Sequence, residues 1–196
     1  MSVCVYILEA AKVFSPHTQT TMASPHALII PYPAQGHVIP LMELSHCLVD
    51  RGFRITFVNT EFNHDRVVAA LSERGGKIHP MIRLVSIPNG MAPDEDQNDL
   101  GKLCEGSVTV MPGYLEEIME KSNESEADRI TWMIADKNMA WALEVAKKVG
   151  VRAAAFWPAA AALLATMMSI PKLIEDGVLD EDGMSSYASN CSFTSL

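Results

Sequence analysis

The chain has 196 residues and a formal net charge of -9 at pH 7, with an isoelectric point near 5.1. No basic cluster interrupts this acidic background, so we expect neither nucleic acid nor an acidic lipid surface as a partner. The longest apolar stretch, residues 153–170, is broken by Pro158 and is too short to cross a bilayer. We therefore predict a buried element there and no integral membrane segment.

The four cysteines form no CxxC pair and no Cys/His spacing of the kind that holds a metal ion. We therefore expect no metal site and no cofactor. Two of them, Cys47 and Cys104, stand in apolar helical segments, a context typical of buried thiols. Unpaired buried thiols are typical of a reducing compartment, which predicts a cytoplasmic protein.

The two ends of the chain differ in composition from the middle. Residues 1–21 fit no secretory signal, because no positive residue precedes the apolar run at 3–8. We interpret them as a poorly ordered extension, with Met22 as a plausible natural start. Residues 22–183 are expected to form one Rossmann-like domain. The Ser-rich residues 184–196 show no periodicity and are expected to form an irregular tail.

Five short apolar or β-branched runs alternate with helical patterns along the chain. The first is continuous and not alternating, which indicates a strand buried on both faces of a parallel sheet. Alternation of strands and helices implies right-handed crossovers and an α/β fold with helices on both faces of one parallel sheet. The predicted strands are 27–30, 54–59, 81–87, 130–135 and 152–156.

The helices between these strands have recognisable ends. Pro40 is expected in the first turn of the first helix, which would run to Val49, and His37 is expected in the loop before it. Asn63 or Asp65 is expected to cap the next helix. Residues 100–121 are mostly helical, with a break near Pro112. The last two helices are predicted at 139–149 and 159–169.

A histidine and a carboxylate fall at the same edge of the predicted sheet. His37 follows the first strand and Asp136 follows the fourth. In the doubly wound order 3-2-1-4-5 these strands are neighbours, at the position where open α/β sheets bind ligands. In the alternative order 2-1-3-4-5 the third strand would separate them.

A carboxylate bound to one imidazole nitrogen fixes the tautomer and makes the other nitrogen a general base. Two plainer interpretations stay open from the residues alone. Asp136 is also placed to cap the helix that starts near Asn138, and His37 is also compatible with a loop histidine bonded to backbone. The chain has no GxSxG, Walker A or GxGxxG motif, so hydrolase, nucleotidase and dinucleotide oxidoreductase functions lack their sequence signals.

Three segments in the same order carry a resemblance to a known family. They are PYPAQGHVIPLMELSHCL, FVNTEFNH and DKNMAWALEVAKKVGVRAAAFWP. They resemble the N-terminal domain of plant family 1 UDP-glycosyltransferases over residues 22–183. The resemblance implies half of a GT-B fold and inverting transfer of a sugar, typically glucose, from a UDP-sugar co-substrate to a small lipophilic acceptor without a metal. It also implies that His37 is the general base and Asp136 its activating carboxylate.

Two departures from the family pattern stand out. Ala159 follows the Phe156-Trp157-Pro158 sequence where many members have a hydroxyl residue near the tryptophan, so one expected contact to the donor sugar is missing. The family's second domain, which binds the UDP-sugar, has no counterpart in the 196 residues. The chain alone is therefore expected to be inactive.

Two classes of function remain open. In the first, the chain is the acceptor-binding half of a glycosyltransferase of plant secondary metabolism, and an apolar pocket is lined or supported by Gly36, Trp141, Phe156, Trp157 and the region 167–168. Ordinary core packing is the alternative role for these aromatic residues. In the second class, the chain is a non-catalytic small-molecule-binding or interaction module, or a nonfunctional truncated product.

Overall fold

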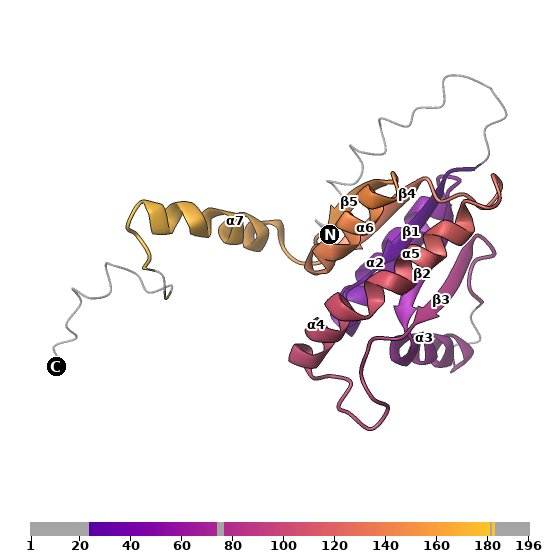
Figure 1. Ribbon diagram of the computed structural model, residues 1–196, viewed down its shortest axis with the longest axis horizontal. Coiled ribbons are helices and arrows are strands. Elements are labelled where there is room, and N and C mark those ends of the chain that lie inside the picture. Colours follow the sequence, from indigo (N-terminus) through magenta and orange to yellow (C-terminus); the bar gives the residue numbers. More distant parts are fainter. Residues whose placement is uncertain (1–23, 74–76, 181, 183–196) are drawn as a thin grey trace, which may run out of the picture. The chain divides into compact units, whose positions relative to one another are not determined.

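The structure is a computed structural model that describes residues 24–73, 77–180 and 182 (Figure 1). These described residues fall into two compact units, one formed by those up to residue 158 and the other by those from residue 159 onward. The predicted extension 1–21 and tail 184–196 lie outside the described residues, and the domain limits 22–183 stay a prediction.

The first unit contains one parallel sheet in the order β3-β2-β1-β4-β5. Of the two strand orders that the sequence left open, this is the doubly wound order 3-2-1-4-5, and it places β1 beside β4. The chain therefore has an α/β fold with a five-stranded parallel sheet. The strands are β1 (His26–Ile30), β2 (Arg54–Thr60), β3 (Ile82–Ile87), β4 (Trp132–Asp136) and β5 (Arg152–Phe156).

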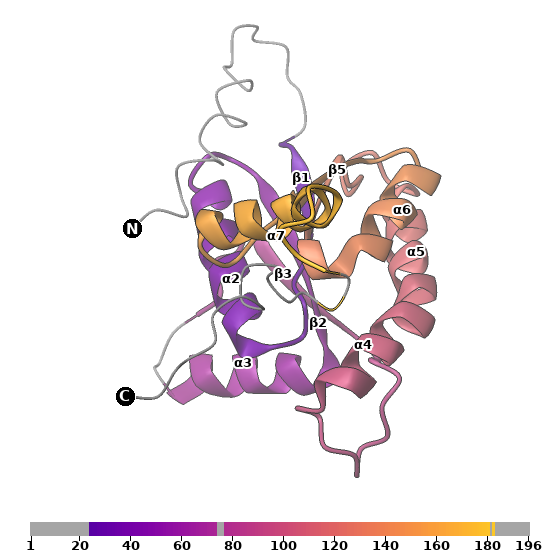
Figure 2. The ribbon, with the colours of Figure 1, turned by 90° about the vertical axis from the view of Figure 1, so that its left-hand side faces the viewer.

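Helices cover both faces of the sheet (Figure 2). One face carries α2 (Gln35–Val49) and α3 (Glu61–Glu73), and the other carries α5 (Met111–Ser122) and α6 (Ala140–Lys148). All five residues of β1 are buried, as expected for the central strand of a sheet covered on both sides. The edge strand β5 buries only Phe156.

Two helices begin earlier than predicted. The carbonyl of Ala34 accepts hydrogen bonds from the backbone N–H of His37 and Val38, so α2 already starts at Gln35. His37 thus lies in the first turn of α2 and not in a loop, and Pro40 lies inside the helix. The prediction for the start of α3 is also wrong, because α3 follows β2 directly and the Thr60 hydroxyl accepts from the Asn63 N–H at 3.3 Å.

The predicted break near Pro112 is confirmed. It separates α4 (Leu100–Thr109) from α5, and Pro112 occupies the first turn of α5, where its missing N–H leaves no helical bond unmade.

The prediction of two buried thiols is wrong: Cys47 is half-buried and Cys104 is exposed. Leu103 takes the buried position of α4, which turns its neighbour Cys104 toward solvent.

The second unit contains α7 (Ala161–Glu175), which is longer than the predicted helix 159–169. It is mostly apolar, and none of its side chains is buried. The prediction of a buried element over residues 153–170 is therefore wrong for all of this stretch except Phe156. Within the described residues no helix has the length and apolar character needed to cross a membrane.

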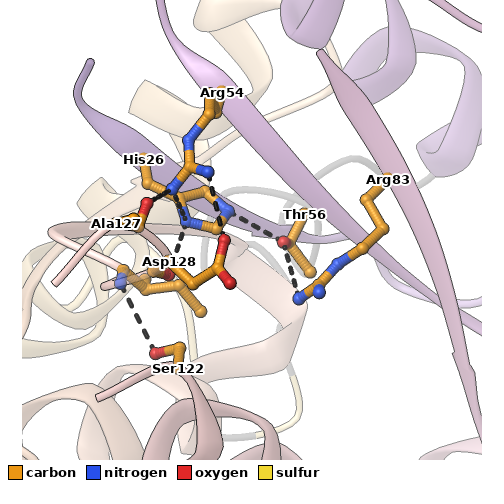
Figure 3. A network of polar contacts seen from close by, with 8 residues as sticks. His26, Arg54, Thr56, Arg83, Ser122, Ala127 and Asp128 are labelled. Atoms are coloured by element: carbon orange, nitrogen blue, oxygen red, sulfur yellow. Dashed lines mark hydrogen bonds and ion pairs between the residues drawn. The ribbon is translucent and has the colours of Figure 1, made fainter. Parts of the chain in front are cut away.

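A network of polar contacts around a buried histidine lies at the edge of the sheet where the strands begin (Figure 3). His26 donates from Nδ1 to the Asp128 carbonyl at 2.8 Å, and its Nε2 accepts from the Thr56 hydroxyl at 2.9 Å. Thr56 in turn accepts from Arg83 at 3.4 Å, and Arg54 donates to the Ala127 carbonyl beside the ring. Burial, together with the charges of Arg54 and Arg83, lowers the pKa of His26 below its ordinary value of 6.5.

His26 should make the fold less stable in mild acid. The unfolded chain takes up a proton at this residue as the pH falls through 6.5, whereas the folded chain resists it. The free energy of unfolding therefore falls below that pH and is unaffected by this group above it. Thermal melts between pH 7.5 and 5.5 should show a smaller pH-dependent loss of Tm in His26→Gln than in the wild type. Equal losses would contradict this role.

The loop after β3 packs directly on α4. A Cβ atom at Gly106 would lie 1.9 Å from the carbonyl oxygen of Asn89, so only glycine fits there. Gly106→Ala should lower the free energy of unfolding by about 1–3 kcal/mol, the usual cost of overpacking. Gly113→Ala is the matched control, because no atom lies within 4 Å of its Cβ position and alanine favours the helix by up to about 1 kcal/mol. Urea titrations should show opposite signs; equal changes would contradict the close contact.

Candidate active site

The carboxyl edge of the sheet, at which all five strands end, holds one histidine–carboxylate pair. Ile30 of β1 pairs in register with Ala135 of β4, so the next residue, Asp136, lies beside the end of β1. The first turn of α2 brings His37 to the same place. The Nδ1 atom of His37 lies 2.7 Å from Oδ2 of Asp136. The predicted meeting of the two side chains is confirmed.

Asp136 fills both roles that the sequence left open. Its Oδ2 binds His37, while its Oδ1 accepts from the backbone N–H of Asn138 at 2.9 Å and caps the short turn η1 (Lys137–Met139). The residue is fully buried. A buried carboxylate requires hydrogen bonds to both oxygens, and the helix cap and the imidazole supply one each.

The geometry determines the tautomer of His37. A carboxylate only accepts hydrogen bonds, so Nδ1 carries the proton in this contact and Nε2 keeps its lone pair when the ring is neutral. Nε2 has no hydrogen-bond partner among the described residues, and 26% of the imidazole side chain is exposed. The pair is thus arranged to take a proton from a bound molecule.

Tyr32 is a neighbour of this pair that the sequence analysis missed. Its ring centroid lies 5.3 Å from that of His37, with 59° between the planes. Its hydroxyl donates to the carbonyl of Leu100 at 3.4 Å, which links the segment before α2 to the start of α4. Burial, first of all, raises the pKa of the Tyr32 hydroxyl. In the sequence, the position of Tyr32 between Pro31 and Pro33, just before His37, was the feature that could have identified it.

The structure brings some of the other predicted residues to the same edge. Gly36 precedes His37 in α2, and a Cβ atom built at Gly36 would meet no described atom within 4 Å beyond its chain neighbours and helix backbone. Phe156 ends β5, pairs in register with Asp136 and is buried. The Lys137 ammonium lies 5.8 Å from the ring centroid of Trp157. Trp141 packs against the core of the α5–α6 face, and its buried Nε1 has no partner in the part of the chain that the structure describes.

The predicted lining residues 167–168 lie in α7, in the second unit, and are exposed. Among the described residues, no group of three His, Cys, Asp or Glu side chains is placed to hold a metal ion.

Asp136→Asn should reverse the tautomer of His37. The Asn138 N–H needs an acceptor, so the new amide should keep its oxygen there and turn its NH₂ toward Nδ1, which must then accept. Nitrogen-15 NMR of the imidazole at pH 8 should show Nδ1–H in the wild type and Nε2–H in the variant.

The matched control for this experiment is Asp99→Asn, which alters a helix cap that does not contact His37. Asp99 accepts from the N–H groups of Gly101 and Lys102. The control should retain Nδ1–H, and Nε2–H in the wild type would refute the assignment.

Comparison with known proteins places the chain among plant enzymes. It is 46% identical to UDP-glycosyltransferase 83A1 of Arabidopsis thaliana over 167 residues, which cover 83% of this chain and 36% of that protein. It is 34% identical to 7-deoxyloganetin glucosyltransferase of Gardenia jasminoides, covering 78% of this chain and 33% of that enzyme. The chain thus spans about a third of the length of these relatives. No family model matches it.

Solved structures share the fold at low sequence identity. Os79 from O. sativa in complex with UDP has a TM-score of 0.59 and 23% identity, over 81% of this chain and 37% of that one. Arabidopsis thaliana UGT89C1 complexed with quercetin has a TM-score of 0.58 and 20% identity, over 74% and 37%. The similarity includes their N-terminal Rossmann-like domain. The chain belongs to the plant UDP-glycosyltransferases, of which it corresponds to the N-terminal part.

Proposed function

We propose that this chain is the acceptor-binding half of an inverting UDP-glycosyltransferase, with His37 as the general base. The observation that supports the proposal best is the hydrogen bond between His37 and the buried Asp136, which leaves Nε2 unpartnered among the described residues at the carboxyl edge. Ligands of open α/β sheets bind at this edge. The relatives whose alignments cover about 80% of this chain are named as glycosyltransferases.

In the proposed reaction, Nε2 of His37 takes the proton of an acceptor hydroxyl as its oxygen attacks the anomeric carbon of the UDP-sugar. The bond between that carbon and the diphosphate oxygen breaks, and UDP leaves with the electron pair. The imidazolium that forms is stabilised by the Asp136 carboxylate at 2.7 Å. Neither residue needs a metal or another cofactor for this proton transfer.

The proposed reaction has two partners, an acceptor and a UDP-sugar. The acceptor is a small lipophilic molecule with a hydroxyl group, since the half-buried Tyr32 and Trp157 supply aromatic surface near the pair. The UDP-sugar is a co-substrate, and we expect most of its contacts in the part of the relatives that this chain does not cover. The unpaired thiols of Cys47 and Cys104 fit a reducing cytoplasm.

The test is a chimera that joins this chain to the C-terminal part of the 46% identical Arabidopsis relative. With UDP-glucose and a panel of phenolic acceptors, the chimera should transfer glucose. His37→Ala should lower turnover by roughly 10²- to 10⁴-fold, as expected for loss of a general base. The control is His46→Ala, which removes an exposed histidine from the same helix and should leave turnover unchanged.

A double variant separates a shared catalytic unit from two independent effects. Asp136 contacts the ring nitrogen that does not take the proton, so its removal should matter little once His37 is gone. Fully additive losses in His37→Ala, Asp136→Asn and the double variant would contradict the pair. Acceptor binding without any transfer by the chimera would favour the alternative function, a non-catalytic small-molecule-binding module.

A further inference from the structure

The hydrogen bond to Asp136 does not by itself fix the orientation of the His37 imidazole. It joins Nδ1 to Oδ2 of Asp136 at 2.7 Å and so restrains one atom of the ring. The ring can still swing about this contact, because 26% of the side chain is exposed and Nε2 has no partner among the described residues. A general base must point its lone pair at the proton it takes. The direction of Nε2 therefore needs a second contact.

The ring of Tyr32 supplies a second contact. Its centroid lies 5.3 Å from the centroid of the His37 ring, with 59° between the two planes, which is the geometry of a tilted aromatic pair. A ring at this distance limits the side-chain rotations of His37 that one hydrogen bond leaves free. The bond to Asp136 and the contact with Tyr32 together restrain both the position and the plane of the imidazole.

Tyr32 is itself held in place. The residues on either side, Pro31 and Pro33, are buried, and each proline fixes its own φ. The half-buried phenol ring packs against the core of the α5–α6 face. Its hydroxyl adds a long hydrogen bond to the Leu100 carbonyl at 3.4 Å, and burial, which raises the pKa of this hydroxyl, keeps the donated proton in place. The ring is thus a fixed surface for the imidazole.

Two backbone hydrogen bonds set the path of the chain between the two rings. The Ala34 N–H donates to the Tyr32 carbonyl at 2.7 Å, which closes a three-residue turn. The Ala34 carbonyl then accepts from the His37 N–H at 2.8 Å and begins α2. With the backbone held in this way, the remaining freedom of the imidazole lies in its own side-chain rotations, and these are what Tyr32 limits.

We propose that Tyr32 is a positioning residue for the general base: its aromatic ring, more than its hydroxyl, holds the His37 imidazole so that Nε2 points toward the acceptor hydroxyl. The role in transfer rests on the proposed function, whereas the restraint of the imidazole is a property of this chain alone. Tyr32 acts through His37 and takes no proton. A misplacement of about 1 Å can slow a reaction by roughly 10²-fold, so loss of the ring should lower turnover while the base is still present.

The restraint is tested on the 196-residue chain by NMR relaxation of the His37 ring. The order parameter of its Cδ2–H bond should fall in Tyr32→Leu and in Tyr32→Met, which remove the aromatic ring but keep an apolar side chain. Tyr32→Phe keeps the ring and should keep the wild-type value. The matched control is Tyr114→Leu, which removes an exposed tyrosine from α5 and should also leave the value unchanged. An unchanged order parameter in both Tyr32→Leu and Tyr32→Met would overturn the proposal.

Kinetics of the chimera distinguish positioning from contact with the acceptor. Tyr32→Leu should lower kcat about 10- to 100-fold, a larger change than any rise in the KM for the acceptor, because the base is misdirected in the transition state. Tyr32→Phe should recover most of this loss, and Tyr114→Leu should lose nothing. A raised KM with unchanged kcat would overturn the proposal, since Tyr32 would then only line the acceptor site.

The two measurements separate this inference from the proposed function. If the order parameter falls in Tyr32→Leu and is kept in Tyr32→Phe, but the chimera transfers no glucose, the restraint of the imidazole by Tyr32 is supported and the proposed function is refuted. If His37→Ala abolishes transfer by an active chimera while Tyr32→Leu matches the wild type, the proposed function stands and the positioning role is refuted.

Discussion

The parallel pairing of β1 with β4 is the constraint on which the candidate active site depends. It joins residues about a hundred positions apart, and its register sets Asp136 one step beyond the end of β1. Because β1 is buried on both faces, its register cannot slip without moving apolar side chains out of the core. The packing of the sheet therefore fixes the carboxylate to which His37 is bonded.

Asp136 is the residue in which fold and chemistry meet. A fully buried carboxylate is costly unless both oxygens are paired, and here one is held by the backbone at Asn138 and the other by the imidazole. The first bond orients the carboxylate, so the second has a defined direction. Asp136, which from the sequence also fits a simple helix cap, therefore holds the imidazole of His37 in one tautomer as well.

Much of this arrangement follows from the sequence, because it depends on strong local patterns and a topological rule. Continuous apolar runs located the strands, and the neighbour order of β1 and β4 placed His37 near Asp136. The start of α2 could not be predicted in this way. It is set by the Ala34 carbonyl, which accepts hydrogen bonds from two backbone N–H groups, and not by Pro40. Backbone hydrogen bonds of this kind do not show in the pattern of side chains. The hydrogen bond of Tyr32 to the Leu100 carbonyl joins two segments distant in sequence, and periodicity does not encode such packing.

The two edges of the sheet differ in how completely their buried polar groups are paired. At the edge where strands begin, both ring nitrogens of His26 are hydrogen-bonded, one to the Asp128 carbonyl and one to Thr56, and Thr56 also accepts from Arg83 (Figure 3). At the carboxyl edge, Asn59, Asn63 and His64 keep unpaired atoms, and Nε2 of His37 has no partner among the described residues. Stability alone would favour pairing at both edges. Of these unpaired atoms, Nε2 of His37 belongs to a side chain that is 26% exposed, whereas those of Asn59, Asn63 and His64 are buried, so it is the imidazole that is placed to meet a bound molecule.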